Sequence, residues 1–212
     1  MHHLHNIRAQ SAPLLICLLI VGTLQASVGQ AELADPTKRA LYLSETLPNQ
    51  TLKERLQSCA LGDFYPTDFS IAHRGAPLGY PEHSREGYVA AAEQGAGVIE
   101  CDVTFTQDLA LVCRHSQCDL ATTTNILQTP LAAKCSKPFR PANGQQPASA
   151  TCCTTDISLA EFKTLCARPD QSNKKAKTVA QYLAPLRSPV VSEPLACGTL
   201  MTHAESIELI DA

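Results

Sequence analysis

A strand–helix–strand pattern constrains the fold of this chain more than any other feature of its sequence. Residues 69–73 are predicted to form a short buried strand. Ser84 is placed to cap the helix that follows, and Gly95 is placed to end it in the left-handed conformation. Residues 98–104 form the next predicted strand, and residues 109–114 a third. This order within about forty residues predicts an α/β fold built on a parallel sheet.

The cysteine content and the N-terminus indicate an oxidising compartment. Ten cysteines among 212 residues are unusual for a cytosolic protein. The polar start includes Arg8, residues 12–24 are almost wholly apolar, and residues 26–31 are mostly small. This order is typical of a signal peptide, so we predict that residues 1–31 are removed and that the protein is secreted or periplasmic. The alternative, an uncleaved membrane anchor, is disfavoured because the apolar run is shorter than the ~20 residues of a span.

The cysteines that remain after such a cleavage are odd in number. Cys17 leaves with the signal peptide, so nine of the ten remain. Either one thiol is free or its partner lies outside this chain. Residues 117–156 are rich in Thr, Ala, Pro, Gln and Cys, and we predict an inserted loop too polar to be held by a core. Disulfides would hold it instead, and at least one is expected between Cys113 and Cys166.

The rest of the chain divides into two predicted segments. Residues 32–68 form an N-terminal helical segment, and residues 69–212 form the N-terminal part of the main domain, with the insertion inside it. A net charge of −3 and a pI near 6.1 give no basic footprint, so a nucleic-acid partner is disfavoured. The basic run at residues 173–177 is interpreted as a solvated surface.

Polar side chains with catalytic potential follow each predicted strand. The His73-Arg74-Gly75 motif comes just past the first strand: imidazole transfers protons near neutral pH, guanidinium binds phosphate, and glycine lets the backbone approach a ligand. Glu100 and Asp102 are two residues apart in the second strand, so both carboxylates are predicted on one face. Such carboxylates repel each other unless a cation lies between them, and their oxygens suit Ca²⁺ or Mg²⁺. His115 supplies a second imidazole, which completes what phosphodiester cleavage requires.

Each of these groups taken alone has a structural explanation. A histidine at a strand end is more often a surface or packing residue, and a single Glu-x-Asp is more often a solvated edge. Cys101 is expected to point away from the carboxylates. The cysteines are not spaced as in a zinc site, so disulfides explain them better. The joint arrangement of these groups is therefore what favours a catalytic site.

The order of these motifs resembles that of the glycerophosphodiester phosphodiesterase family. Four motifs over residues 69–124 carry the resemblance: His73-Arg74-Gly75, Pro81-Glu82-His83-Ser84, Glu100-Cys101-Asp102, and His115 followed by Asp119. The resemblance implies a TIM-type barrel and a divalent cation. It also implies hydrolysis of small-molecule glycerophosphodiesters to an alcohol and glycerol 3-phosphate.

The resemblance also assigns roles to five residues of this chain. It implies that His73 and His115 are the acid–base pair and that Arg74 binds the phosphate. It implies that Glu100 and Asp102 are ligands of Ca²⁺ or Mg²⁺. Glu82 matches a family position near the site whose role stays open. One histidine would act as base while the other protonates the leaving alkoxide. The attacking group is either water or a hydroxyl of the substrate.

The sequence departs from the family's pattern in ways that bear on activity. His83 stands where Asn is usual, and three residues separate His115 from Asp119. A third metal carboxylate in a Glu-x-Lys context is not found before Ala212. About 180 residues follow the signal peptide, fewer than the ~200 of a small closed barrel, so we expect an incomplete barrel with an exposed apolar face and negligible activity. The alternatives are a truncated inactive fragment and a phospholipase D-like enzyme of the same superfamily, which the His-Arg-Gly motif disfavours.

Overall fold

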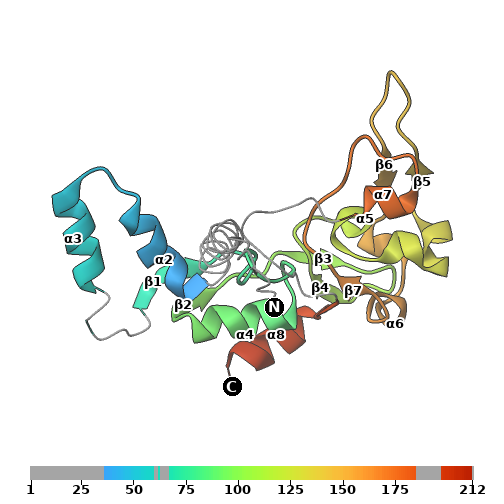
Figure 1. Cartoon of the computed structure of the whole chain (residues 1–212). Helices are drawn as coiled ribbons and strands as arrows, with labels where there is room; N and C mark the ends of the chain where they lie inside the picture. The colour runs from blue at the N-terminus through green and yellow to red at the C-terminus, as the bar shows by residue number, and fades with distance from the viewer. Residues whose placement is uncertain (1–35, 60–61, 63–66, 185–196, 212) are drawn as a thin grey trace, which may run out of the picture.

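The structure is a computed structural model that describes residues 36–59, 62, 67–184 and 197–211 (Figure 1). Two helices, α2 (Pro36–Glu45) and α3 (Gln50–Ser58), lie where the sequence predicts an N-terminal helical segment. Asn49 caps α3 by accepting a 2.9 Å hydrogen bond from the Leu52 amide. The predicted signal peptide lies outside the described residues. Within them, no helix is long and apolar enough to cross a membrane.

The predicted strand–helix–strand unit is confirmed. It consists of β1 (Thr67–Ala72), α4 (Arg85–Glu93) and β2 (Ala96–Ile99), and the two strands pair in parallel, with Ile71 opposite Val98. Ser84 caps α4 by accepting a 3.1 Å hydrogen bond from the Gly87 amide. Gly95 follows the helix with φ +83°, as its predicted left-handed conformation requires.

The prediction that the first strand is buried is wrong. Every residue of β1 except Ala72 is exposed, and the side chains of Phe69 and Ile71 are 94% and 64% exposed. The physical reason is that β1 belongs to a sheet of two strands, so no described element covers the face that Phe69 and Ile71 share. An exposed apolar face is what the sequence predicts for an incomplete barrel.

The second predicted strand is interrupted where its carboxylates lie. The strand β2 ends at Ile99, and β3 (Val103–Phe105) pairs antiparallel with β4 (Leu111–Cys113). The segment 100–102 between them changes partner: the Glu100 amide still donates to Ala72 O of β1 (3.1 Å), whereas Asp102 O accepts from the Arg114 amide beside β4 (3.0 Å). The prediction of one continuous strand over residues 98–104 is therefore wrong.

Residues 117–183, which we call the disulfide module, form a packed unit and not a loop. Its elements are short: α5 (Leu120–Thr123), η2 (Ile126–Gln128), η3 (Pro130–Lys134), β5 (Lys137–Arg140), β6 (Ser149–Thr151), η4 (Thr154–Asp156), α6 (Leu159–Phe162), β7 (Cys166–Ala167) and α7 (Val179–Tyr182). Leu120, Ile126, Ile157 and Phe162 are fully buried in its apolar core. The expectation that this segment is too polar for a core is wrong, because residues from its whole length, including Tyr182, build the core together.

Four disulfides link eight of the nine described cysteines. Cys118–Cys153 and Cys135–Cys152 lie inside the disulfide module, which confirms the disulfide predicted between residues 113 and 166. The other two are Cys101–Cys113 and Cys166–Cys197. Cys59, just after α3, is exposed and free, so it is the odd thiol among the nine cysteines.

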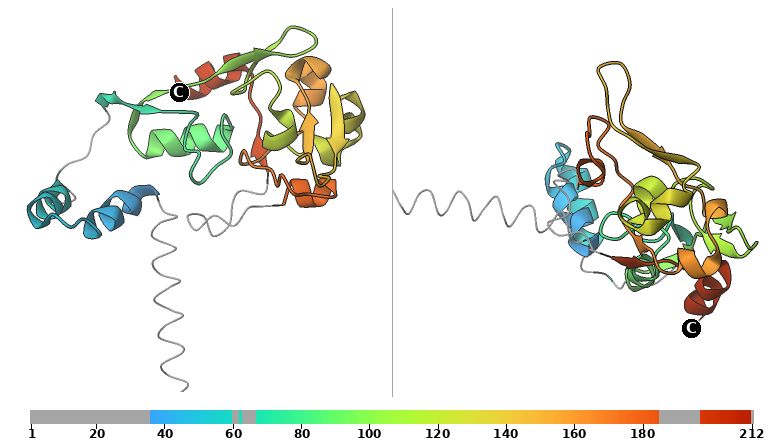
Figure 2. Two further views of the ribbon diagram at one scale, coloured as in Figure 1. Left: turned by 90° about the horizontal axis from the view of Figure 1, so that it is seen from above. Right: turned by 90° about the vertical axis from the view of Figure 1, so that its right-hand side faces the viewer.

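The C-terminal part of the chain returns to the parallel unit. The strand β8 (Gly198–Thr199) pairs antiparallel with β7, and α8 (His203–Ile210) lies beside α4 (Figures 1 and 2). The Glu86 carboxylate of α4 accepts hydrogen bonds from the amide (2.9 Å) and the hydroxyl (2.7 Å) of Thr199. These bonds join segments that are 113 residues apart in the sequence.

Candidate active site

Arg74 lies at the centre of a polar cluster at the end of β1. Its φ of +64° falls in the left-handed region, which residues other than glycine adopt rarely. Its amide donates to Glu100 Oε2 (2.8 Å), and its Nη1 donates to Glu82 Oε2 (2.9 Å). Burial disfavours the charge, but the hydrogen bond to Glu82 and the surrounding carboxylates raise the pKa of Arg74 above its usual value. The guanidinium is therefore a fixed cation held among carboxylates.

Gly75 fits the loop against helix α4. Its φ is +89°, and a Cβ at this position would lie 3.0 Å from the backbone carbon and oxygen of Gly87. Both facts explain why glycine follows Arg74. The sequence suggests that this glycine lets the backbone approach a ligand, whereas in the structure the backbone it approaches is that of α4.

Glu100 and Asp102 meet as predicted, although the strand that was expected to align them is interrupted. A carboxylate oxygen of each lies within 4.8 Å of the other and of a ring nitrogen of His83. The side chain of Cys101, between them, points to β4 and forms the disulfide with Cys113. Cys101 is therefore not a metal ligand, as the sequence predicts.

His83 fixes the position of Asp102. The imidazole is fully buried, with Nε2 3.1 Å from Asp102 Oδ2 and Nδ1 3.0 Å from the Tyr88 hydroxyl. Burial and the charge of Arg114 lower the pKa of His83 to about 4, so the ring is neutral at pH 7. Because a carboxylate only accepts, we assign the proton to Nε2, and Nδ1 then accepts from Tyr88. Burial also raises the pKa of Tyr88, which keeps this hydroxyl a donor.

Arg114 is the residue of the cluster that the sequence interpretation missed. Its side chain is fully buried and forms ion pairs with Glu82 (3.4 Å) and Asp119 (3.3 Å). Glu82, whose role the sequence left open, thus bridges two arginines, Arg74 and Arg114. The position of Arg114 directly before His115 at a strand end was the available signal. A buried guanidinium needs such partners, since an unpaired buried charge is costly.

Both predicted catalytic histidines are exposed at the surface, and His115 lies beside this cluster. His115 is exposed, and one of its ring nitrogens lies within 4.8 Å of carboxylate oxygens of Glu82 and Asp119. His73 is also exposed and is joined to Arg74 by the peptide bond. The structure thus brings together Arg74, Glu100 and Asp102 directly and places the imidazole of His115 at the edge of the same charged cluster, whereas His73 is next to it in the sequence.

The donor set of this cluster fits a divalent cation. Glu100 and Asp102 offer carboxylate oxygens, which are the ligands that Ca²⁺ and Mg²⁺ prefer. The Arg74 Nε lies 3.9 Å from Asp102 Oδ2, so a phosphate held by this guanidinium would lie next to the same carboxylate. The arrangement can therefore place a cation and an arginine on one phosphate group.

A family model described as the glycerophosphoryl diester phosphodiesterase family matches residues 73–203, which is more than half of the chain. The chain belongs to this family. The match confirms the resemblance read from the motifs and gives the fold class, an α/β TIM-type barrel. The described residues contain a parallel strand–helix–strand unit of this fold and no closed barrel.

Individual relatives match shorter stretches. A Mycobacterium tuberculosis protein named "Probable glycerophosphodiester phosphodiesterase 1" is 47% identical over 49 residues, 23% of this chain and 18% of the relative. A glycerophosphodiester phosphodiesterase of Arabidopsis thaliana is 30% identical over 82 residues, 39% of this chain and 20% of the relative. The chain spans about a fifth of the length of the curated relatives it matches. A solved structure from Silicibacter pomeroyi bearing the same family's name matches at 20% identity with a TM-score of 0.44, over 70% of this chain and 41% of that one.

Proposed function

We propose that this protein is a metal-dependent glycerophosphodiester phosphodiesterase that acts on small-molecule substrates outside the cytoplasm. One observation carries the proposal: at the end of β1, the guanidinium of Arg74 lies 3.9 Å from Asp102, its backbone amide donates to Glu100, and the two carboxylates lie together. An arginine fork matches a phosphate in bidentate fashion, and paired carboxylates suit a divalent cation. A phosphodiester is a substrate class that an arginine and a divalent cation can bind together.

The residues of the cluster have separate roles in this proposal. Glu100 and Asp102 hold the divalent cation, which when bound supplies positive charge to the phosphate oxygens. Arg74 orients the phosphate, and its own position is set by Glu82. His83 keeps Asp102 in place through a hydrogen bond whose donor is fixed by Tyr88. The substrate therefore meets charges that are already oriented.

Proton transfer is assigned to the two surface imidazoles, His73 and His115. One removes the proton of the attacking hydroxyl or water, and the other protonates the leaving alkoxide. Their exposure leaves both rings accessible to a substrate from solvent. His83 is excluded from this role because it is buried and both of its nitrogens are engaged.

The location and domain boundaries complete the proposal. Four disulfides are consistent with an extracytoplasmic location. We assign residues 1–31 to a signal peptide, residues 32–68 to a helical segment and residues 69–212 to the phosphodiesterase domain, with the cysteine-rich insertion at about 117–156.

Turnover of glycerophosphocholine tests the histidine assignment. In a full-length parent that holds these residues within a closed barrel, His73→Ala and His115→Ala should each lower the release of glycerol 3-phosphate by roughly 10²- to 10⁴-fold with little change in unfolding midpoint. Ser116→Ala, a change of an exposed side chain next to His115, is the matched control and should retain the rate. A rate unchanged by either histidine substitution would remove that residue from the mechanism.

The exposed face of β1 favours a second candidate function, which is binding of a cation and a phosphate without turnover. In the described part of the chain, every sheet has two strands, and the cation site has two carboxylates from one segment. Saturable binding of Mn²⁺ with no EDTA-sensitive release of glycerol 3-phosphate would identify this function. Release that EDTA abolishes would identify the enzyme.

A further inference from the structure

Positive charge is concentrated in the disulfide module. Residues 134–177 contain eight Lys and Arg against three Asp and Glu, which leaves nine against 17 in the rest of the chain. Two of the eight, Lys134 and Lys163, form ion pairs with Glu161 and Glu205. Five others are exposed and form no ion pair in the described residues: Lys137, Arg140, Lys174, Lys175 and Lys177. A chain with a net charge of −3 thus carries a local excess of exposed positive charge in this module.

Three of these cations lie on a segment that is fixed against the β5–β6 hairpin. The Ala142 amide donates to Ala176 O, and the Ala148 amide donates to Lys174 O, both at 2.8 Å. The side chains of Ala148 and Ala176 are buried in the core of the module. The backbone that carries the lysines is therefore held at two points, and the positions of their Cα atoms are set before any ligand binds.

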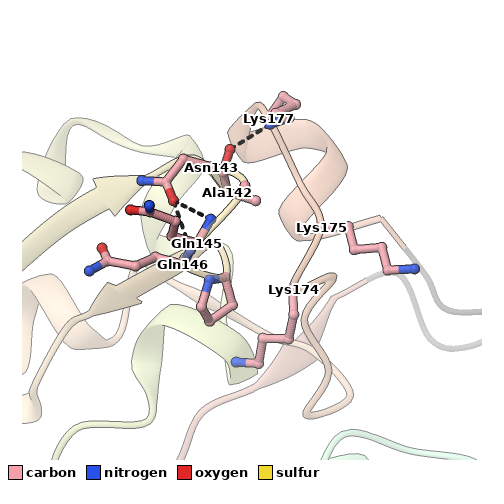
Figure 3. Close-up of a pocket in the computed structure, with 9 residues that line it drawn as sticks. Ala142, Asn143, Gln145, Gln146, Lys174, Lys175 and Lys177 are labelled. Carbon is pink, nitrogen blue, oxygen red and sulfur yellow. Dashed lines mark hydrogen bonds between the residues drawn. The ribbon is translucent and has the colours of Figure 1, made fainter.

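The hairpin tip and the lysine segment line one open pocket (Figure 3). Its charged lining residues are Lys174, Lys175 and Lys177, and no carboxylate lines it. Asn143 holds the tip in shape, because its Oδ1 accepts from the amides of Gln145 (3.0 Å) and Gln146 (2.7 Å). The side-chain amides of Gln145 and Gln146 add neutral donors to the same pocket.

The ammonium groups keep donors available. Lys177 donates one hydrogen bond, at 2.6 Å, to Ala142 O, which aims it at the hairpin and leaves two of its three N–H groups. Lys174 Nζ lies 5.9 Å from the ring centroid of Tyr182, so an aromatic face holds this side chain as well. Lys175 points away from the hairpin into solvent in Figure 3 and contributes charge at longer range.

We propose that this pocket is a second phosphate-binding site, separate from the hydrolytic centre. Lysine binds phosphate as a point charge, so Lys174 and Lys177 with neutral amide donors, and the charge of Lys175 at longer range, match a group with several anionic or accepting oxygens. The hairpin projects from the module in Figures 1 and 2, so a phosphate on an extended surface can reach it. The phosphate comes either from a lipid headgroup or from a free phosphate, and the two sources share the chemistry that the pocket recognises.

Vesicle binding by the full chain tests the proposal. The protein should bind vesicles of phosphatidylcholine with added phosphatidylglycerol but not phosphatidylcholine alone, and the binding should weaken as salt rises. The triple variant K174Q/K175Q/K177Q should bind roughly 100-fold more weakly, about fivefold for each lysine. The variant K174R/K175R/K177R should bind as the wild type does, since it keeps the charge.

Inorganic phosphate distinguishes the source. If phosphate displaces the protein from vesicles more strongly than chloride does at equal ionic strength, the pocket recognises free phosphate too. If the two salts act equally, the lipid headgroup at the vesicle surface is the ligand. E100Q/D102N should bind vesicles as the wild type does, so the result does not depend on the hydrolytic function.

A matched charge control separates the pocket from overall charge. K53Q/R55Q/R85Q removes three cations outside the module and should leave most of the vesicle binding intact. Equal losses in this control and in the pocket variant would overturn the proposal. Wild-type binding by K174Q/K175Q/K177Q, or no binding of either probe by the wild type, would also overturn it.

Discussion

The parallel unit that carries the candidate site and the disulfide module are stabilised in opposite ways. The module buries apolar side chains such as Ile126 and Phe162 and contains two internal disulfides. The parallel unit leaves Phe69 and Ile71 exposed and has only small apolar clusters, around Ala91 and Tyr88, while Arg114 and His83 beside it are fully inaccessible. The chain therefore has an apolar core in its insertion and a polar, hydrogen-bonded interior at its site.

This difference indicates that the geometry of the candidate site is held by a small number of specific contacts. Apolar packing is spread over many side chains, so each one contributes only a small part of the stability of the core. A buried ion-pair network loses much more stability than an apolar core does when one side chain is removed, because the remaining charge stays buried without a partner. Substitutions of the buried charges in the cluster should therefore lower stability as well as function, whereas substitutions in the apolar core of the module should lower stability alone.

Arg114→Met should have the largest effect. It removes the guanidinium that pairs with Glu82 and Asp119 and leaves two carboxylates in a buried setting. We expect a loss of about 3–5 kcal/mol in the free energy of unfolding, measured by urea denaturation. Arg55→Met, at an exposed position of α3, is the control and should change stability by less than about 0.5 kcal/mol. Equal effects of the two substitutions would contradict the buried network.

Removal of the Cys101–Cys113 disulfide should rank second and should separate the two regions most clearly. This bond ties the interrupted segment 100–102 to β4, and its sequence separation is 12 residues. C101S/C113S should lose about 3 kcal/mol of stability. It should also weaken Mn²⁺ binding by roughly tenfold or more, because the segment that holds both carboxylates is released.

The matched control for this disulfide is C135S/C152S in the module. Its bridge has a similar sequence separation, 17 residues, so a similar loss of stability is expected. Mn²⁺ affinity should stay at the wild-type value, because this bond lies in the module. A comparable loss of affinity in both variants would show that the disulfides act only through global stability.

Gly75→Ala should have an intermediate effect. Its φ of +89° and the 3.0 Å approach to the Gly87 backbone both disfavour a Cβ. We expect a loss of about 1–3 kcal/mol, read from thermal unfolding. Gly79→Ala is the control, since a Cβ there meets no atom within 4 Å and its φ is not positive. A Gly75 variant as stable as the Gly79 variant would refute this account of the loop.

Glu86→Gln should have the smallest effect, and the effect should depend on pH. Although burial alone would raise the pKa of Glu86, the two hydrogen bonds from Thr199 outweigh it and lower the pKa below its usual value. The carboxylate therefore stabilises the fold above its unfolded pKa of about 4.3, and this contribution is lost as the pH falls through the lower folded value. Since the group is partly exposed, we expect about 1 kcal/mol or less of stability from it at pH 7. The difference between Glu86→Gln and the wild type in urea denaturation should vanish at low pH; a difference independent of pH would contradict this.

Local signals in the sequence were enough to predict that Glu100 and Asp102 lie close together, but not how the structure holds them there. Ser84 and Gly95 act within their own helix, so the predicted helix limits agree with the structure. Glu100 and Asp102 converge as predicted, but the reason is different. The segment changes its hydrogen-bonding partner from β1 to β4, and strand periodicity does not report such a change.

Contacts between distant segments account for what the sequence did not show. Arg114 pairs with Glu82, which lies 32 residues before it in the sequence, and nothing in a local window marks that pairing. The core of the disulfide module also depends on contacts between residues that are distant in the sequence. Residues as far apart as Leu120 and Tyr182 build it, so a composition rich in Thr, Pro and Gln concealed it. The prediction of a buried β1 was wrong because burial depends on neighbouring strands.

Cation binding tests the central claim most directly, because it requires no turnover. A titration of the full chain with Mn²⁺, followed by electron paramagnetic resonance, should show one saturable site per chain. E100Q/D102N should lose this site while it keeps the four disulfides and the wild-type unfolding midpoint. Glycerol 3-phosphate should bind more tightly when Mn²⁺ is present, and Arg74→Gln should abolish that gain. Mn²⁺ binding of equal strength and stoichiometry in E100Q/D102N would contradict the assignment of these carboxylates and, with it, the proposed site.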